Sequence, residues 1–281
     1  MRTQKMTRRM AGLVCLMAAL LPCKAANTGN TPYAATHPVV DVENGYLLGG
    51  SAGGKWVSDT AAAKPLLGGE MYRLYSATRA LGTARGTKPQ GQGAPCPETL
   101  SVDVTPKPAP EARIAVAGAW NALPRVPQIL PTTSPVYREV VRKELAQHGL
   151  TKLTVKIDQI WRVDLDGDGR DEILISANNY AYDTQGVSPP SASRAGDYSL
   201  LLVRRIVSGR VRTFVLGEEY YTHAKTFNAP NDAHVAAVLD VNGDGKMEII
   251  VHDRYYEGSG TSVFQMGANG FQSVLSSGCG A

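Results

Sequence analysis

Residues 163–176 of this 281-residue chain, VDLDGDGRDEILIS, carry a concentrated set of carboxylates that could bind a metal ion. Five acidic side chains fall within the nine residues from Asp164 to Glu172, and an apolar run follows at once. Carboxylates this close repel one another, so the folded state must bind either protons or a cation. A hard divalent cation such as calcium, which takes about six to eight oxygen ligands, meets this need.

The spacing of these acids predicts a loop that wraps one calcium ion. Counting from Asp164 as position 1, oxygen ligands recur at alternate positions, position 6 is a glycine suited to a sharp turn, and the residue at position 7 can offer its backbone carbonyl. The predicted ligands of the first site are Asp164, Asp166, Asp168, the carbonyl of Arg170, and Glu172.

Residues 239–253, LDVNGDGKMEIIVHD, repeat the pattern. Placing Asp164 on Asp240 aligns the glycines at position 6, the glutamates at position 9 and the apolar runs beyond them. The predicted ligands of the second site are Asp240, Asn242, Asp244, the carbonyl of Lys246, and Glu248. Two matching loops favour metal binding over metal-free Asp–Gly turns, so we expect two Ca²⁺ sites. Since protein oxygens fill the ligand positions, we expect a structural role for the metal.

The loops differ from EF-hands in their closing ligand and in their flanks. An EF-hand needs a glutamate at position 12 and helices on both sides. Position 12 is Ile175 in the first loop and Val251 in the second, and the flanking runs are strand-like. The glutamate at position 9 therefore begins the outgoing strand, and calcium would join the two strands of a β-hairpin.

The strands around each loop form a repeated unit. The copies, about 153–217 and about 231–278, both read strand, acidic loop, strand, longer loop, strand, tight turn, strand. That order is a meander, the unit of propeller blades. The predicted fold is mainly β, with two tandem four-stranded blade-like meanders that make a partial or irregular β-propeller. A smaller N-terminal β-rich region and one helix complete it.

DLDGDGRDE and DVNGDGKME, each between strand-like runs, resemble the calcium loops of FG-GAP or VCBS-type repeats of integrin α-chains and secreted bacterial proteins. The resemblance covers about residues 153–278 and implies calcium-binding, β-propeller-like repeats. The Phe-Gly and Gly-Ala-Pro signature does not occur in order, and only two clear copies are present. A closed propeller needs at least about four blades. Either the N-terminal region contributes further sheets, or two blade-like sheets pack together without closing a ring.

The first 25 residues predict a signal peptide. Four basic residues among the first nine precede an apolar run over 10–22, and small residues ending at Ala25 permit cleavage. The run is too short to span a bilayer and no later run qualifies, so we expect no transmembrane segment in the mature chain. We expect export to the periplasm or the extracellular space. A lipoprotein acylated on Cys23 is the weaker alternative.

Removing this leader changes the charge and the cysteine count. The full chain has 29 Lys and Arg against 25 Asp and Glu, but the leader holds five of the basic residues and no acid, which leaves a net charge of about −1. The mature chain therefore offers no basic surface for nucleic acid. Cys96 and Cys279 remain, and in an oxidising compartment they can form one disulfide if they meet in space, which the sequence leaves open.

The rest of the chain divides into three segments by composition. Residues 26–110 are β-rich and end in a proline-rich linker, and residues 153–281 form the repeat domain. The connecting segment, 111–152, contains a helix over 135–148, where a proline suits the first turn and apolar residues recur at helical spacing.

Catalytic motifs are not found in the sequence. There is no nucleophile motif or phosphate loop, and the five histidines lie at no zinc-ligand spacing. The insertion 183–196 is either a variable binding loop or a disordered segment. Several tyrosines at strand ends either pack between sheets or form a face for a ligand. These are Tyr180, Tyr182, Tyr220, Tyr221, Tyr255 and Tyr256.

Together these features predict an exported calcium-binding protein that acts as a binding module for an unknown protein or glycan ligand. The alternatives are a secreted hydrolase on the same scaffold, for which the sequence offers no catalytic residues, and a purely structural envelope protein.

Overall fold

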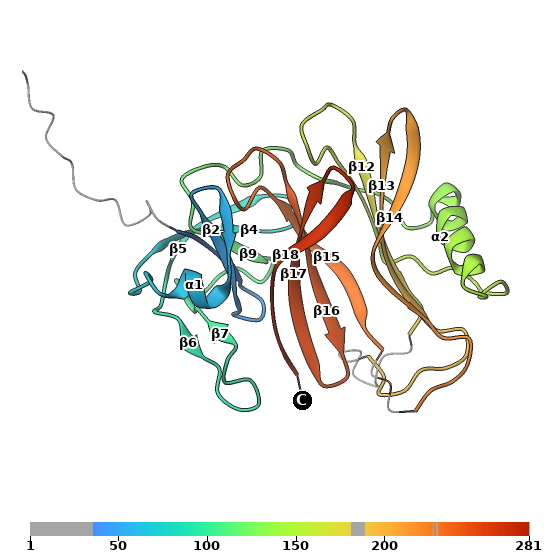
Figure 1. Ribbon diagram of the computed structural model, residues 1–281, viewed down its shortest axis with the longest axis horizontal. Helices are drawn as coiled ribbons and strands as arrows, with labels where there is room; N and C mark the ends of the chain where they lie inside the picture. Colours follow the sequence, from blue (N-terminus) through green and yellow to red (C-terminus); the bar gives the residue numbers. More distant parts are fainter. Residues whose placement is uncertain (1–35, 181–188, 227, 229, 281) are drawn as a thin grey trace, which may run out of the picture. The chain divides into compact units, whose positions relative to one another are not determined.

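Antiparallel β-sheets make up most of the regular secondary structure of the described residues, as the sequence predicts. The computed structural model describes residues 36–180, 189–226, 228 and 230–280. All of them belong to one compact unit, Pro32–Ala281. The predicted signal peptide lies outside the described residues. Within them are three larger sheets, a two-stranded ribbon and two helices (Figure 1).

The N-terminal part forms a seven-stranded sheet in the order β3-β2-β1-β9-β4-β5-β8. Its central strand β9 comes from the predicted connecting segment and pairs with both β1 and β4. A short helix, α1 (Asp59–Ala63), was not foreseen; the Ser58 hydroxyl caps it by accepting the Ala61 N–H at 3.3 Å. The strands of the sheet are β1 (His37–Asp41), β2 (Leu47–Ala52), β3 (Lys55–Val57), β4 (Met71–Tyr75), β5 (Ala80–Gly86), β8 (Val104–Thr105) and β9 (Ile114–Val116). The separate ribbon pairs β6 (Gln90–Gly91) with β7 (Leu100–Ser101).

The first repeat forms a five-stranded sheet in the order β10-β11-β12-β13-β14. The predicted meander is present, and the short strand β10 extends one edge. The predicted helix is also present as α2 (Pro135–Gln147), ending one residue earlier than expected. The strands are β10 (Gln128–Ile129), β11 (Gln159–Val163), β12 (Glu172–Asn178), β13 (Tyr198–Val207) and β14 (Arg210–Tyr220).

The second repeat forms a four-stranded sheet in the order β15-β16-β17-β18. Each strand pairs with its neighbour in sequence, so this copy is the predicted meander without additions. No sheet among the described residues closes into a barrel. The strands are β15 (Asp232–Leu239), β16 (Glu248–Tyr255), β17 (Gly258–Gly267) and β18 (Gly270–Gly280).

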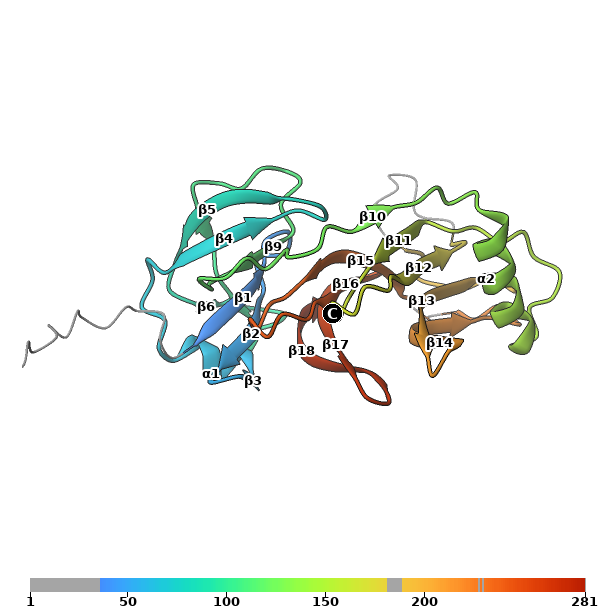
Figure 2. The ribbon, with the colours of Figure 1, turned by 90° about the horizontal axis from the view of Figure 1, so that it is seen from above.

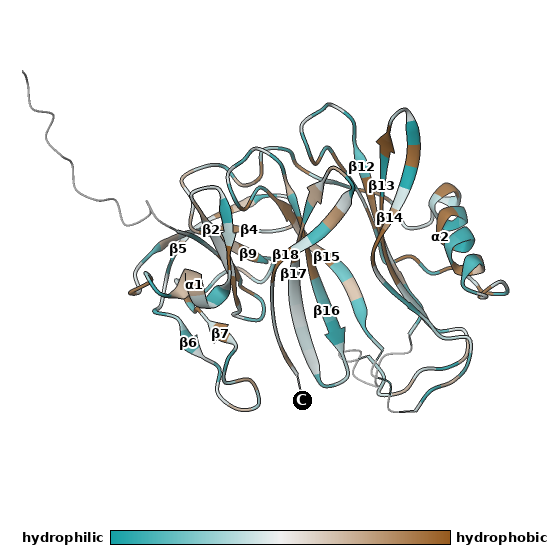
Figure 3. Cartoon of the chain, in the orientation of Figure 1, coloured by the Kyte–Doolittle hydropathy of each residue, from teal (hydrophilic) through white to brown (hydrophobic). Residues whose placement is uncertain are grey.

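Successive buried side chains along the strands of the first repeat belong to two different cores, so both faces of its sheet are covered. In β12, Leu174 joins the core shared with the second repeat, while Ile175 joins the cluster beneath α2 with Val141 and Leu145. Successive side chains of a strand point to opposite faces, so a continuous apolar run suits a sheet covered on both sides. Figure 3 shows that α2, which covers one face of this sheet, carries both apolar and polar residues.

The second repeat lies between the other two sheets (Figure 2). On one side β15 contacts β12 and β13, and on the other β18 contacts β2 and β3. One buried core joins residues of all three sheets, including Ile114, Leu174 and Ile249. The disulfide that the sequence left open is present: Cys96 and Cys279 are joined with a Cα–Cα distance of 5.6 Å.

Candidate metal centre

The register of two hairpins places the acidic loops in equivalent positions. Val163 pairs with Glu172 across β11 and β12, and Leu239 pairs with Glu248 across β15 and β16. In each case the residue before the loop faces the position-9 glutamate. Each loop therefore closes the end of a β-hairpin, as the sequence predicts.

The first loop is folded around its own carboxylates. The two oxygens of Asp164 accept the Gly167 N–H at 2.7 Å and the Gly169 N–H at 3.0 Å. Glu172 accepts the Leu165 N–H at 2.9 Å. Asp166 and Asp168 each accept the N–H two residues ahead, at 3.3 and 2.8 Å.

The second loop repeats all five of these hydrogen bonds. Asp240 accepts the Gly243 N–H at 2.6 Å and the Gly245 N–H at 3.0 Å, and Glu248 accepts the Val241 N–H at 3.1 Å. The side chains at positions 3 and 5 again accept the N–H two residues ahead, at 2.9 and 2.8 Å. The two loops therefore match in their hydrogen bonds as well as in their sequences.

Positive φ angles at positions 4 and 6 let the chain wrap around the first carboxylate. Gly243 and Gly245 have φ of 80° and 85°, and the corresponding glycines of the first loop have 78° and 82°. Residues with a Cβ rarely adopt this region. The sequence analysis identified the glycine at position 6; the one at position 4 is equally required.

The position-9 glutamates are buried, and their ionised form requires a cation close by. Glu172 is 3 % exposed and Glu248 is 1 % exposed. Burial, with the charges of Asp166 and Asp168, raises the pKa of Glu172 to about 7. Burial, with the charges of Asp244 and Asp240, raises the pKa of Glu248 to about 8. Ionising either group in the folded protein is unfavourable unless positive charge lies close by.

The predicted ligands are gathered to different degrees in the two loops. In the first loop, one oxygen from each of Asp164, Asp166 and Glu172 lies within 4.8 Å of the others. Asp168 is exposed and outside this group. The carboxylates of the second loop do not form an equally tight group in the part of the chain described.

A cation of the protein itself reaches the first loop. The Arg205 guanidinium of β13 lies 3.5 Å from the Asp166 carboxylate, and both side chains are 18 % exposed. This ion pair offsets part of the negative charge of the first loop.

In the second loop, burial raises the pKa of Asp240 at position 1.

Arg125, which the sequence analysis did not single out, holds the two loops together. Its guanidinium donates to the carbonyl oxygens of Asp164 at 2.6 Å, Leu165 at 3.0 Å and Gly245 at 2.9 Å. The Met247 N–H also donates to the Leu165 carbonyl at 2.8 Å. The loops are therefore neighbours, and one arginine bonds to the backbone of both.

Trp120 fixes the second loop from the same segment. Its indole N–H donates to the Asp240 carbonyl at 2.7 Å, and the Asp240 N–H donates to the Ala122 carbonyl at 2.8 Å. A Cβ on Gly243 would lie 3.0 Å from the Trp120 ring. No local pattern marks either Trp120 or Arg125, because their partners are distant in sequence.

The tyrosines divide between interior and surface. The hydroxyls of Tyr180 and Tyr221 both donate to one Glu219 oxygen, at 2.8 and 2.9 Å, and both rings are buried. Tyr256 is 50 % exposed. Tyr182 and residues 183–188 of the insertion 183–196 lie outside the described residues.

Comparison with known proteins assigns neither a family nor a function to this chain. No family model, curated protein or solved structure matches this chain. In the part of the chain described, neither helix has the length and apolar character required to cross a membrane.

Proposed function

We propose that this chain is an exported, calcium-binding β-repeat protein that acts as a binding module, with one structural Ca²⁺ in each acidic loop. The observation that carries the proposal is the pair of loops with five matching hydrogen bonds, each closed by a buried glutamate. Calcium would supply the positive charge that the buried carboxylates need and would join the strands of each hairpin. The residues that would hold it are Asp164, Asp166, Asp168, Glu172 and the Arg170 carbonyl in the first loop, and Asp240, Asn242, Asp244, Glu248 and the Lys246 carbonyl in the second.

Membership of the FG-GAP or VCBS-type repeats is part of this proposal. Two meanders with an acidic loop between their first two strands support it. The described sheets pack against each other instead of closing a ring, which accords with a partial or irregular propeller.

Export is supported by the leader-like N-terminus and by the Cys96–Cys279 disulfide, since such bonds persist in oxidising compartments. A binding role is supported by a cavity lined by Tyr46, Tyr255 and Tyr256 beside the disulfide. Tyrosine rings with polar neighbours suit contacts with a protein or a glycan.

Metal analysis and thermal unfolding test the calcium sites. After dialysis against calcium, the wild type should retain two equivalents, and Asp164→Asn and Asp240→Asn should each retain one. The control is Asp171→Asn, which removes a charge from the first loop but alters a side chain that pairs outward with Arg162 at 3.2 Å. Two retained equivalents in the control and an EDTA-sensitive melting temperature are expected. Absence of bound calcium in the wild type would contradict the proposal.

The binding role is tested separately by capture of glycans or envelope proteins on the immobilised wild type and on Tyr256→Ser. The variant should lose captured material that the wild type retains in calcium. If both proteins captured the same material, the cavity beside Tyr256 would not be the binding site.

A further inference from the structure

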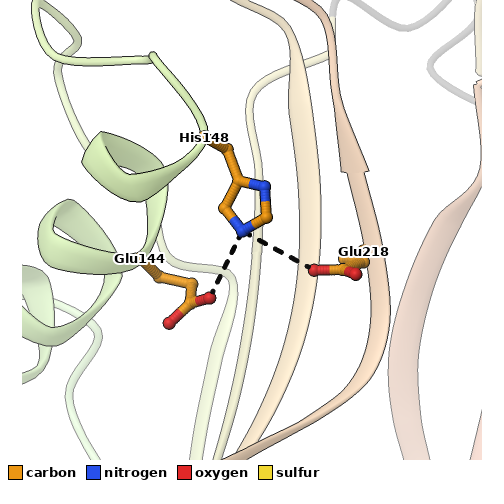
Figure 4. A group of neighbouring side chains, drawn as sticks. All are labelled: Glu144, His148 and Glu218. Carbon is orange, nitrogen blue, oxygen red and sulfur yellow. Dashed lines mark ion pairs between the residues drawn. The ribbon is translucent and has the colours of Figure 1, made fainter.

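A second group of potential metal ligands lies between the helix and the edge strand of the first repeat. Glu144 and His148 stand one helical turn apart at the C-terminal end of α2, and Glu218 comes from β14 (Figure 4). His148 Nε2 lies 3.6 Å from a Glu144 oxygen and 4.0 Å from a Glu218 oxygen. One donor atom from each of the three residues lies within 4.8 Å of the others.

These distances fit a small tetrahedral cation. Zinc binds histidine nitrogen and carboxylate oxygen at about 2.0–2.2 Å, which separates tetrahedral ligands by about 3.3–3.5 Å. The present separations of up to 4.8 Å are longer than this, and rotation about the side-chain bonds of Glu144 and Glu218 would close the three atoms to that spacing. Calcium, by contrast, requires about six to eight oxygen ligands, which this group does not offer.

Tyr220 holds two of the three ligands in place independently of any ion. Its ring stacks on the His148 imidazole at a centroid distance of 3.7 Å and an interplanar angle of 10°. Its hydroxyl donates to a Glu218 oxygen at 3.0 Å. Hydrogen bonds of this kind orient metal-binding side chains and strengthen metal affinity.

The site is open to solvent on one side. The side chains of His148 and Glu218 are 37 % and 47 % exposed, while that of Glu144 is 16 % exposed. An ion bound here would be reached from outside, and a fourth ligand could come from water or from another molecule.

We propose that Glu144, His148 and Glu218 bind one divalent cation of the zinc class, through His148 Nε2 and one oxygen of each glutamate. The two carboxylates balance the charge of the ion, and Tyr220 is a positioning residue. Because the ligands come from α2 and β14, the ion ties the end of the helix to the edge of the sheet. The site is separate from the acidic loops and does not depend on their binding calcium.

Titration of the metal-stripped protein with zinc at a constant millimolar calcium concentration tests this site. The wild type should bind one zinc equivalent, and Glu144→Gln, His148→Gln and Glu218→Gln should each weaken binding at least about tenfold. The matched control is Glu139→Gln on the same helix, an exposed glutamate paired with Arg142 and outside the group. Its zinc affinity should equal that of the wild type.

Two further measurements separate a metal site from a purely structural contact. Tyr220→Phe keeps the ring but loses the hydrogen bond to Glu218, so zinc affinity should fall about tenfold while the zinc-free melting temperature stays close to that of the wild type. At a zinc concentration that just saturates the wild type, zinc should raise the melting temperature of the wild type and of Glu139→Gln equally, and that of the ligand variants and Tyr220→Phe less. Zinc binding that is absent from the wild type, or unchanged in all three ligand variants, would overturn the proposal whatever the calcium content.

Discussion

Replacing Glu248 by glutamine should have opposite effects on stability in the calcium-free and calcium-bound protein. The Glu248 side chain is buried in the second loop and accepts the Val241 N–H at 3.1 Å. Burial, with the charges of Asp244 and Asp240, raises its pKa from 4.5 to about 8. Glutamine has nearly the same shape and keeps an acceptor for Val241, but it carries no charge and offers a poorer calcium ligand.

The sign of the calcium-free effect follows from the protons bound by each state. Between pH 4.5 and about 8 the folded protein keeps a proton on Glu248 that the unfolded chain releases. Stability therefore falls as pH rises through this window. At about 1.4 kcal/mol per pKa unit, burial of Glu248 lowers the free energy of unfolding, relative to its value well below pH 4.5, by about 1 kcal/mol at pH 5 and about 4 kcal/mol at pH 8. Glu248→Gln removes this penalty.

Thermal unfolding in EDTA at pH 5 and pH 8, and in millimolar calcium at pH 8, measures the effect. For a chain of this size about 1 kcal/mol corresponds to about 2–4 °C, so in EDTA at pH 8 the variant should melt roughly 8–16 °C above the wild type. At pH 5 the difference should shrink to about 2–4 °C. In calcium the order should reverse, because the variant has lost a ligand.

Glu257→Gln is the control, since Glu257 is exposed and lies outside the loops. Its melting temperature should equal that of the wild type under all three conditions. If Glu248→Gln melted below the wild type in EDTA at pH 8, the reasoning would be refuted, because the Glu248 carboxylate would then stabilise the fold without a cation.

Two further predictions concern the packing of the second loop and the disulfide. Gly243→Ala should destabilise the protein more than Gly245→Ala in denaturant unfolding: both residues have positive φ, but only at Gly243 does a Cβ lie 3.0 Å from the Trp120 ring. Equal losses would show that the Trp120 contact is unimportant. Removing the Cys96–Cys279 disulfide by a double serine substitution should cost up to about 5 kcal/mol, because its closure spans a sequence separation of 183 residues. An unchanged melting temperature in this variant would contradict that expectation.

The parts of the structure that the sequence predicts are those set by neighbouring residues. The ligand positions, the turn glycines and the closing glutamate of each loop lie within nine residues, so their spacing alone predicts the hairpin between Val163 and Glu172. The meanders are also local, since each strand of the second repeat pairs with the next in sequence. The proline at the start of α2 likewise marks the beginning of that helix.

Contacts between distant segments could not be predicted in this way. The strand β9 enters the seven-stranded sheet between two strands that precede it by many residues, and its three-residue length gives little periodicity. The histidines show no zinc spacing along the chain, yet the fold brings Glu218 of β14 to His148 at the end of α2. The group of Glu144, His148 and Glu218 therefore forms only because α2 packs on the sheet.

The segment that follows β9 links the two acidic loops to the N-terminal sheet. Tyr75 of β4 accepts the Ala122 N–H at 3.1 Å, and the Ala122 carbonyl accepts the Asp240 N–H at 2.8 Å. A few residues further on, Arg125 bonds to carbonyl oxygens of both loops. Except for the bond to the Gly245 carbonyl, the bonds to the loops use backbone groups of the first ligand of each loop or of its neighbour, and the carboxylate oxygens of that ligand accept N–H groups of the loop. Calcium that fixes those carboxylates would therefore also restrain the backbone that Arg125 and Ala122 hold. On this geometry, loss of calcium should loosen the contact between the repeats and the N-terminal sheet as well as the hairpins themselves.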